Sequence, residues 1–187
     1  MKKIFISAWA VFCLCSAGMG NDLLIPCNDF KVIGKSRYSD WQKRNFSYGE
    51  KIQFEKHIFS LPEEVDEIHC TPFKADFNAD GKEDYILQVA GTGNGSNFGM
   101  CDIYIYVTCP EKAGDGLSYG HVVLGANGQK FRYMHMSSYG ISAARTGKKI
   151  ILKGTSLSND RRTRLIHYYS FDANGWMKEI AVQLLKN

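Results

Sequence analysis

The sequence predicts an all-β domain, mainly an antiparallel meander that forms a sandwich or a twisted sheet, with a minor helical element. Two observations predict this class. Short segments of alternating apolar and polar residues recur along the chain, and turn-forming residues separate them. The count of 18 glycines against 4 prolines agrees with many turns, and no long amphipathic helix is visible. A length of 187 residues suits one such domain.

The first twenty residues have the three-part pattern of a secretory signal peptide. A basic start is followed by an uncharged apolar run at 4–15 and then by small residues. The run is shorter than the roughly 20 residues of a membrane-spanning helix, which favours cleavage near Gly18 or Gly20 over an uncleaved anchor. The sequence therefore predicts a signal peptide at 1–20 and a single β-rich domain at 21–187, periplasmic or secreted.

The first half of this domain carries weak strand signals. Residues 30–33 favour a short strand, and residues 51–59 alternate apolar and polar side chains. Pro62 and the two glutamates after it favour a short helical turn. This turn is the predicted minor helical element.

The strand pattern is clearer after residue 84. Residues 85–90 form a short apolar run, and residues 102–108 alternate strictly. Successive side chains of a strand point to opposite faces, so Ile103 and Ile105 are expected on one face and Tyr104 on the other. Three predicted hairpins follow: 121–124 with 129–136 around a turn at 126–128, 141–144 with 149–153 around 145–148, and 164–171 with 176–183 around 172–175.

An acidic loop precedes the strand predicted at 85–90. Its oxygen-bearing side chains alternate along a tight segment, and Gly81 allows a sharp backbone turn. Calcium prefers six to eight oxygen ligands, so this spacing favours a calcium site over a solvated acidic turn. The expected ligands are Asp76, Asn78, Asp80, the backbone carbonyl of Lys82, and Asp84. The expected role of Ca²⁺ is to hold together a loop whose carboxylates repel one another.

The loop resembles the calcium loops of the FG-GAP and VCBS repeat families. In those families an Asp-x-Asn-x-Asp-Gly-x-x-Asp segment leads directly into a β-strand, as residues 76–84 do here. An EF-hand would carry a bidentate Glu at the twelfth loop position, where this chain has Leu87. The resemblance covers this loop alone and implies the five calcium ligands named above. One loop does not support a complete propeller.

Four cysteines remain after removal of the predicted signal peptide, and an even count in an oxidising compartment predicts two disulfides. Cys101 and Cys109 stand at opposite ends of one predicted strand, roughly 25 Å apart, which is too far for a disulfide. If 85–90 pairs antiparallel with 102–108, Cys109 lies near the acidic loop. The predicted pairs are Cys70–Cys109 and Cys27–Cys101.

Other candidate chemistry is weaker. His135 and His167 lie in predicted strands, where a surface or half-buried role is commoner than that of a catalytic base. Tyrosines such as Tyr104 and Tyr133 follow from β-propensity, and the alternative is a surface for sugars or proteins. The glycine-rich segment 91–95 is not expected to hold phosphate, because a strand and not a helix follows it.

These patterns together predict an exported, calcium-stabilised, non-catalytic interaction domain whose partner is another protein in the cell envelope. One version is an immunity or inhibitor protein that acts against an envelope-acting toxin or lytic enzyme. The alternatives are a carbohydrate or cell-wall binding module and a calcium-dependent extracytoplasmic hydrolase that uses His135 or His167. A net charge of +4 is too small to favour nucleic acid, and no stretch after the signal peptide is apolar enough to span a membrane.

Overall fold

The fold is all-β, as the sequence predicts. A computed structural model describes residues 23–33, 51–60, 72–90, 100–114, 120–158 and 163–185. The predicted signal peptide and the predicted helical turn after Pro62 lie outside these ranges. In the part of the chain that is described, no helix is long and apolar enough to cross a membrane.

The strands form three antiparallel sheets. The central sheet has six strands in the order β1 (Ile25–Pro26), β5 (Phe73–Ala75), β6 (Asp84–Ala90), β7 (Cys101–Thr108), β9 (Lys130–Ser138) and β8 (Val122–Leu124). The second sheet has β10 (Ile141–Thr146), β11 (Lys149–Leu157), β12 (Arg164–Phe171) and β13 (Met177–Leu185), in that order. The third sheet has β2 (Phe30–Ile33), β3 (Lys51–Phe54) and β4 (His57–Ser60).

The three predicted hairpins are confirmed, with different boundaries. The β8–β9 connection contains a short 3-10 turn, Ala126–Gly128, in which Asn127 has a φ of 56°. This is the positive φ for which Asn-Gly is suited. The β10–β11 turn is tighter than predicted, because β10 continues to Thr146. The β12–β13 pair contains a bulge at Tyr168 and Tyr169.

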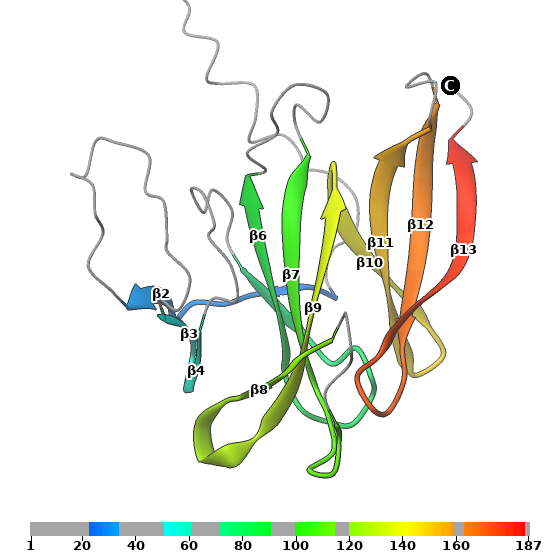
Figure 1. Cartoon of the computed structure of the whole chain (residues 1–187). Helices are drawn as coiled ribbons and strands as arrows, with labels where there is room; N and C mark the ends of the chain where they lie inside the picture. Colours follow the sequence, from blue (N-terminus) through cyan, green and yellow to red (C-terminus); the bar gives the residue numbers. More distant parts are fainter. Residues whose placement is uncertain are drawn as a thin grey trace, which may run out of the picture.

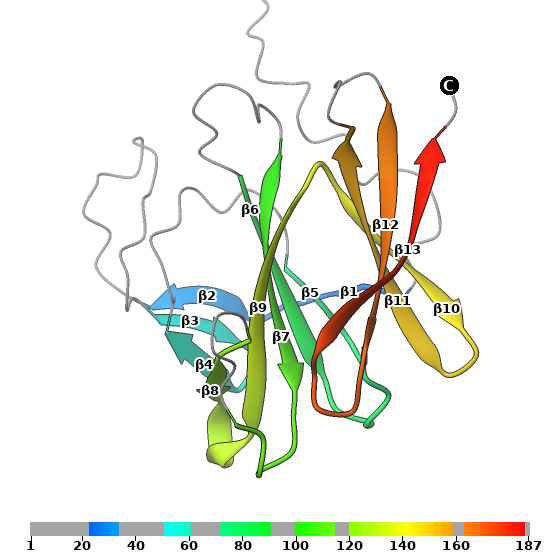
Figure 2. The ribbon, with the colours of Figure 1, turned by 45° about the vertical axis from the view of Figure 1, so that its right-hand side comes forward.

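The central sheet packs against another sheet on each face, so the described part of the molecule has three layers (Figures 1 and 2). On one face, Tyr85 and Tyr106 pack with Phe54 and Phe59 of the small sheet. On the other face, Ile103, Ile105 and Val107 of β7 pack with side chains of the four-stranded sheet, including Leu152 and Phe171. The predicted alternation along β7 is therefore correct, and burial on both sides explains why neither set is polar.

The two larger sheets join at a corner after β9, which Figure 2 shows leading directly into β10. Ser138 is completely buried there, and its hydroxyl accepts the Thr155 N–H at 2.7 Å and donates to the Gly140 carbonyl at 2.6 Å. These bonds satisfy backbone groups where regular strand pairing stops. Gly154 lies against the Met136 side chain at the same corner, where a larger residue would collide with it.

A buried arginine joins the same two sheets at their other end. Arg132 of β9 is 1% exposed and donates to three backbone carbonyls: Asn174 at 3.0 Å, Gly120 at 2.6 Å and Gly114 at 3.1 Å. Its guanidinium carbon lies 3.8 Å from the centre of the Trp176 ring. Because Asn174 and Trp176 belong to the β12–β13 turn, Arg132 fastens that turn to the central sheet.

Candidate functional site

The acidic loop joins β5 to β6 and is tightly wound. Ala79 and Gly81 have φ values of 61° and 81°. This winding turns backbone N–H groups toward the Asp76 carboxylate, which accepts from Asp80 and from Gly81, each at 3.0 Å. The start of the predicted ion loop is thus held by hydrogen bonds within the loop itself.

The middle of the loop is tied to the end of β7. The Asn78 amide donates to the Thr108 carbonyl at 2.8 Å. The Asp80 carboxylate accepts the Thr108 hydroxyl at 2.8 Å and the Lys82 N–H at 2.9 Å. Thr108, which no sequence pattern singled out, is therefore the partner of several loop residues.

Asp84, the first residue of β6, is completely buried. One of its carboxylate oxygens accepts the Phe77 N–H at 2.7 Å, and the other accepts the Thr108 N–H at 2.7 Å and hydroxyl at 3.0 Å. Burial raises the pKa of Asp84 to about 7, although the hydrogen bonds from Thr108 and Phe77 act in the opposite direction. Asp84 fixes the start of the loop and the end of β7 to the start of β6.

The five predicted calcium ligands lie in one loop, between β5 and the start of β6. Among the described residues, no group of three or more His, Cys, Asp or Glu side chains is close enough to hold a metal ion. The reason is visible at Asp84, whose two oxygens face Phe77 and Thr108 in the protein interior. Calcium binding by this loop stays a prediction.

The predicted disulfides are not formed in the structure. Cys27 and Cys109 are buried free thiols, and burial raises the pKa of Cys27 to about 12. Cys27 packs in the core on the tyrosine-bearing face of the central sheet, whereas Cys101 packs against the core on the opposite face, so the sheet separates this predicted pair. Cys70, the predicted partner of Cys109, lies outside the described residues.

The tyrosines of the central sheet do not offer a binding surface. Tyr104, Tyr106 and Tyr133 share one face, as expected, but they are 2%, 0% and 6% exposed. Tyr106 packs 5.3 Å from Tyr133 and 4.6 Å from the stacked ring of Phe59, measured between ring centres. This face is a core, because the small sheet covers it.

The two candidate histidines lie on different sheets. His135 of β9 contacts Asp102 at 3.2 Å, and the hydrogen bond from His135 is the main cause that lowers the pKa of Asp102. His167 of β12 lies on the four-stranded sheet between Ser156 and Glu179. The sequence did not single out Ser156 or Glu179, because they lie on different strands from His167. Only the pairing of these strands brings the three side chains together.

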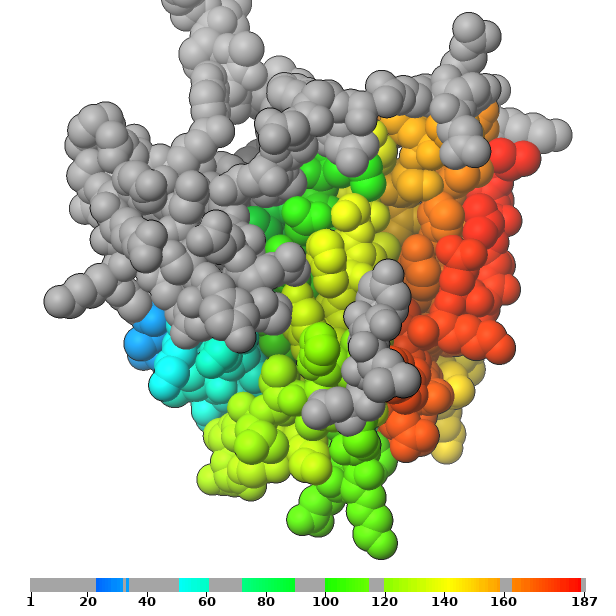
Figure 3. Space-filling model, in the orientation of Figure 1, coloured from blue at the N-terminus to red at the C-terminus, as the bar shows by residue number. Residues whose placement is uncertain are grey.

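A second feature that the sequence did not reveal is the outer edge of the four-stranded sheet. β13 is the last strand of that sheet and pairs only with β12 among the described strands. Ile180, Val182 and Leu184 of this strand are 50%, 49% and 59% exposed. Figure 3 shows β13 in red at the outer edge of the molecule.

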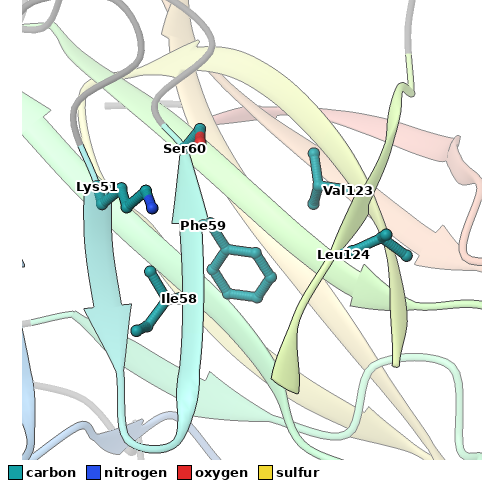
Figure 4. A pocket seen from close by; sticks show the side chains of 6 residues that line it. All are labelled: Lys51, Ile58, Phe59, Ser60, Val123 and Leu124. Atoms are coloured by element: carbon teal, nitrogen blue, oxygen red, sulfur yellow. The ribbon is translucent and has the colours of Figure 1, made fainter. Parts of the chain in front are cut away.

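A shallow apolar groove lies between β4 and β8 (Figure 4). Its volume is about 490 Å³, and its lining residues are Lys51, Ile58, Phe59, Ser60, Val123 and Leu124. Ile58 and Leu124 are 43% and 61% exposed, while Phe59 is buried at its base. The groove carries no cluster of polar groups that would orient a ligand.

These features define an all-β protein with three antiparallel layers, a hydrogen-bonded acidic turn and an exposed apolar edge strand. Comparisons with known protein families, with curated proteins and with solved structures find no match to this chain.

Proposed function

We propose that this chain is an exported, protein-binding domain of the cell envelope, and that β13 is the strand with which its partner pairs. The observation that carries the proposal is the apolar edge of β13, which pairs with β12 alone among the described strands. Edge strands of soluble proteins are usually protected by charges, prolines or a covering segment, because an open edge pairs readily with other strands. The stretch from Ile180 to Leu185 contains no charged residue.

The proposed mode of binding is the addition of an extended segment of the partner to β13. Backbone hydrogen bonds give such a complex its affinity, and side chains at alternate positions give it specificity. Val182 lies opposite His167 and Leu184 opposite Leu165, so their side chains share one face. A partner with apolar residues at every second position matches this face.

The partner class that suits the proposal is an envelope enzyme or toxin that this chain inhibits. Export follows from the signal-peptide pattern of the first twenty residues. A binding domain of this kind acts by covering the partner at equal stoichiometry. If the partner is an enzyme, adding the purified chain is expected to lower its turnover. Charged substitutions in β13 are expected to remove this inhibition.

The test is site-specific photo-crosslinking in cells that express the full chain. A photo-crosslinking residue replaces Leu184 in one variant and Arg145, an exposed residue of the opposite edge strand β10, in the matched control. We expect one discrete protein adduct at position 184 and none at 145. The recovered partner is then purified, and Val182→Lys with Leu184→Lys is expected to weaken its binding at least about tenfold, because two half-buried apolar contacts are lost.

Two results would contradict the proposal. The first is the absence of any adduct at position 184 in cells where the partner gene is expressed. The second is equal binding of the purified partner to the native chain and to the doubly charged variant. Circular dichroism of the variant shows that the comparison is made between folded proteins.

Calcium binding by the acidic loop is a separate proposal. It is supported by the winding of the loop at Ala79 and Gly81 and by two carboxylates, those of Asp76 and Asp80, near its surface. The inward position of Asp84 counts against it. The protein-binding proposal does not depend on the ion.

A further inference from the structure

Three side chains from three adjacent strands form a connected row on the four-stranded sheet. Ser156 of β11, His167 of β12 and Glu179 of β13 lie on one face. The Ser156 hydroxyl is 2.7 Å from Nε2 of His167, and Nδ1 of His167 is 2.6 Å from the Glu179 carboxylate. A nucleophile that contacts a base, which in turn contacts an orienting carboxylate, is the arrangement that activates serine for acyl transfer.

The direction of the hydrogen bonds follows when Glu179 is ionised and the His167 imidazole is neutral. An ionised carboxylate only accepts, so Nδ1 of His167 carries the proton and donates to Glu179. A neutral imidazole then presents Nε2 as an acceptor, and the Ser156 hydroxyl donates to it. This is the tautomer in which His167 is ready to take the serine proton.

The row is partly open to solvent and has apolar neighbours. The His167 and Glu179 side chains are 21% and 45% exposed, and Ser156 is partly buried. Leu165, Val182 and Leu184 lie on the same face of the sheet. An acyl chain that lies along these side chains would place its carbonyl near Ser156.

A second serine, histidine and carboxylate on this chain lack the connection and serve as an internal control. The Ser137 hydroxyl donates to Asp102 at 3.0 Å, and His135 contacts the same carboxylate oxygen at 3.2 Å. Both groups therefore bind the acid, and no bond between Ser137 and His135 is found. The Asp102 carboxylate is therefore shared by the two side chains.

We propose that Ser156 is an activated nucleophile and that this face hydrolyses esters of short apolar acyl chains. The Ser156 oxygen attacks the ester carbonyl, and its proton passes to Nε2 of His167. His167 then gives that proton to the leaving alkoxide as the carbon–oxygen bond breaks. Water attacks the acyl-serine by the same relay and releases the carboxylic acid. Glu179 acts as a positioning residue for His167.

The experiment measures covalent labelling of the full chain by a fluorophosphonate probe, located by mass spectrometry, together with hydrolysis of p-nitrophenyl butyrate. We expect the probe on Ser156 and no labelling of Ser156→Ala. His167→Asn is expected to lower both rates at least about 100-fold, the typical contribution of a general base. Glu179→Gln lowers them because its amide does not hold the Nδ1–H tautomer, and Glu179→Asp restores part of the loss.

The matched control is Ser137→Ala, which is expected to label and hydrolyse at the native rate. The proposal is overturned if the folded native chain is not labelled, if the label is found on another residue, or if Ser156→Ala is labelled as fast as the native chain. Circular dichroism of each variant separates loss of reactivity from loss of fold. These outcomes do not depend on whether a protein partner binds β13.

Discussion

At the scale of single residues, the most important group is the carboxylate of Asp84, which the sequence predicts to be a calcium ligand. Asp84 is completely buried and accepts three hydrogen bonds from Phe77 and Thr108. A buried donor that loses its acceptor is costly, because it had given up water to enter the interior. Asp84 therefore stabilises the fold whether or not calcium binds the loop.

Substitution of Asp84 separates these two roles. Asp84→Ala leaves the N–H groups of Phe77 and Thr108 without their acceptor, and we expect a loss of roughly 3 kcal/mol in the free energy of unfolding, with calcium or with chelator. Urea denaturation of the full chain measures this loss. A loss below about 1 kcal/mol would contradict the assigned role.

Two substitutions at the loop surface test calcium itself. If the loop binds calcium, the native chain gains roughly 2.7 kcal/mol at a hundredfold excess of the ion over its dissociation constant, and Asp80→Ala abolishes this gain. Asp76→Ala is expected to behave like Asp80→Ala. Thermal unfolding with calcium and with chelator is the measurement, and an equal shift in the native chain and both variants would exclude the site.

His57 is a buried histidine whose charge opposes folding. It is 5% exposed, and its Nδ1 accepts the Ala126 N–H at 3.1 Å. Burial is the main cause that lowers the pKa of His57, and the charge of Lys56 lowers it further. The charge of Glu83 raises it. In the unfolded chain His57 has the ordinary histidine pKa of about 6.5 and binds a proton below that pH. In the folded chain its lowered pKa disfavours this proton, so the free energy of unfolding contributed by His57 falls as the pH falls.

We therefore expect protonation of His57 to lower the free energy of unfolding between pH 7.5 and pH 5.5, whereas Asp84, whose raised pKa lets the folded chain bind a proton first, raises it over the same range. His57→Asn keeps an acceptor for Ala126 but does not titrate, so on going to pH 5.5 its free energy of unfolding is expected to rise relative to that of the native chain. Asp84 and the other ionisable groups are the same in both proteins, so the difference between the two curves isolates His57. Parallel curves would show that His57 does not resist protonation.

At the scale of elements, β13 has the length and alternation of an inner strand and the position of an edge strand. Its bulge opposite Tyr168 and Tyr169 twists this edge, as bulges at sheet edges commonly do. The strand is joined to the core at its beginning, where Met177 belongs to the core cluster, while Val182 and Leu184 extend beyond it. The exposed half of β13 therefore contributes little to folding and is available for binding.

This separation predicts a distinct pattern of stability. Leu184→Lys is expected to change the free energy of unfolding by less than about 0.5 kcal/mol, as is usual for exposed positions. Leu152→Ala in β11, which is completely buried, is expected to cost about 2–5 kcal/mol through loss of burial and formation of a cavity. Chemical denaturation compares the two variants, and a large loss in Leu184→Lys would mean that β13 is part of the core.

At the scale of the whole molecule, the layers are held together by few but specific contacts. The larger sheets share an apolar core, a corner at Ser138 and the Arg132 clamp. The clamp places a buried cation against three carbonyls and the Trp176 ring, and these groups compensate its charge.

Removing the clamp is expected to loosen the two sheets together. Arg132→Ala should lower the free energy of unfolding by about 3 kcal/mol or more, because three carbonyls lose a charged donor. Arg132→Lys should lose less, because it keeps the charge but not the planar fork. Trp176→Phe is the mildest change. Thermal and urea unfolding rank the three, and equal stability of Arg132→Ala and the native chain would contradict the clamp.

The sequence by itself determined the local structure. Alternation along 102–108 and Asn-Gly turns such as Asn127 to Gly128 depend on neighbouring residues, so the strands and hairpins were predictable. The sequence also shows the spacing of the oxygen-bearing residues in the acidic loop, but it does not show the direction in which their side chains point. Whether Asp84 faces an ion or the interior depends on Thr108, which comes from another strand.

Only the tertiary structure decided what meets across the sheets. It buried the tyrosine face under the small sheet, separated Cys27 from Cys101, and left Val182 exposed at an edge. It also aligned Ser156 with His167, although no motif joins them in the sequence. The physical reason is that turns and alternation act over a few residues, whereas layer order, burial and long-range hydrogen bonds follow from how the sheets pack.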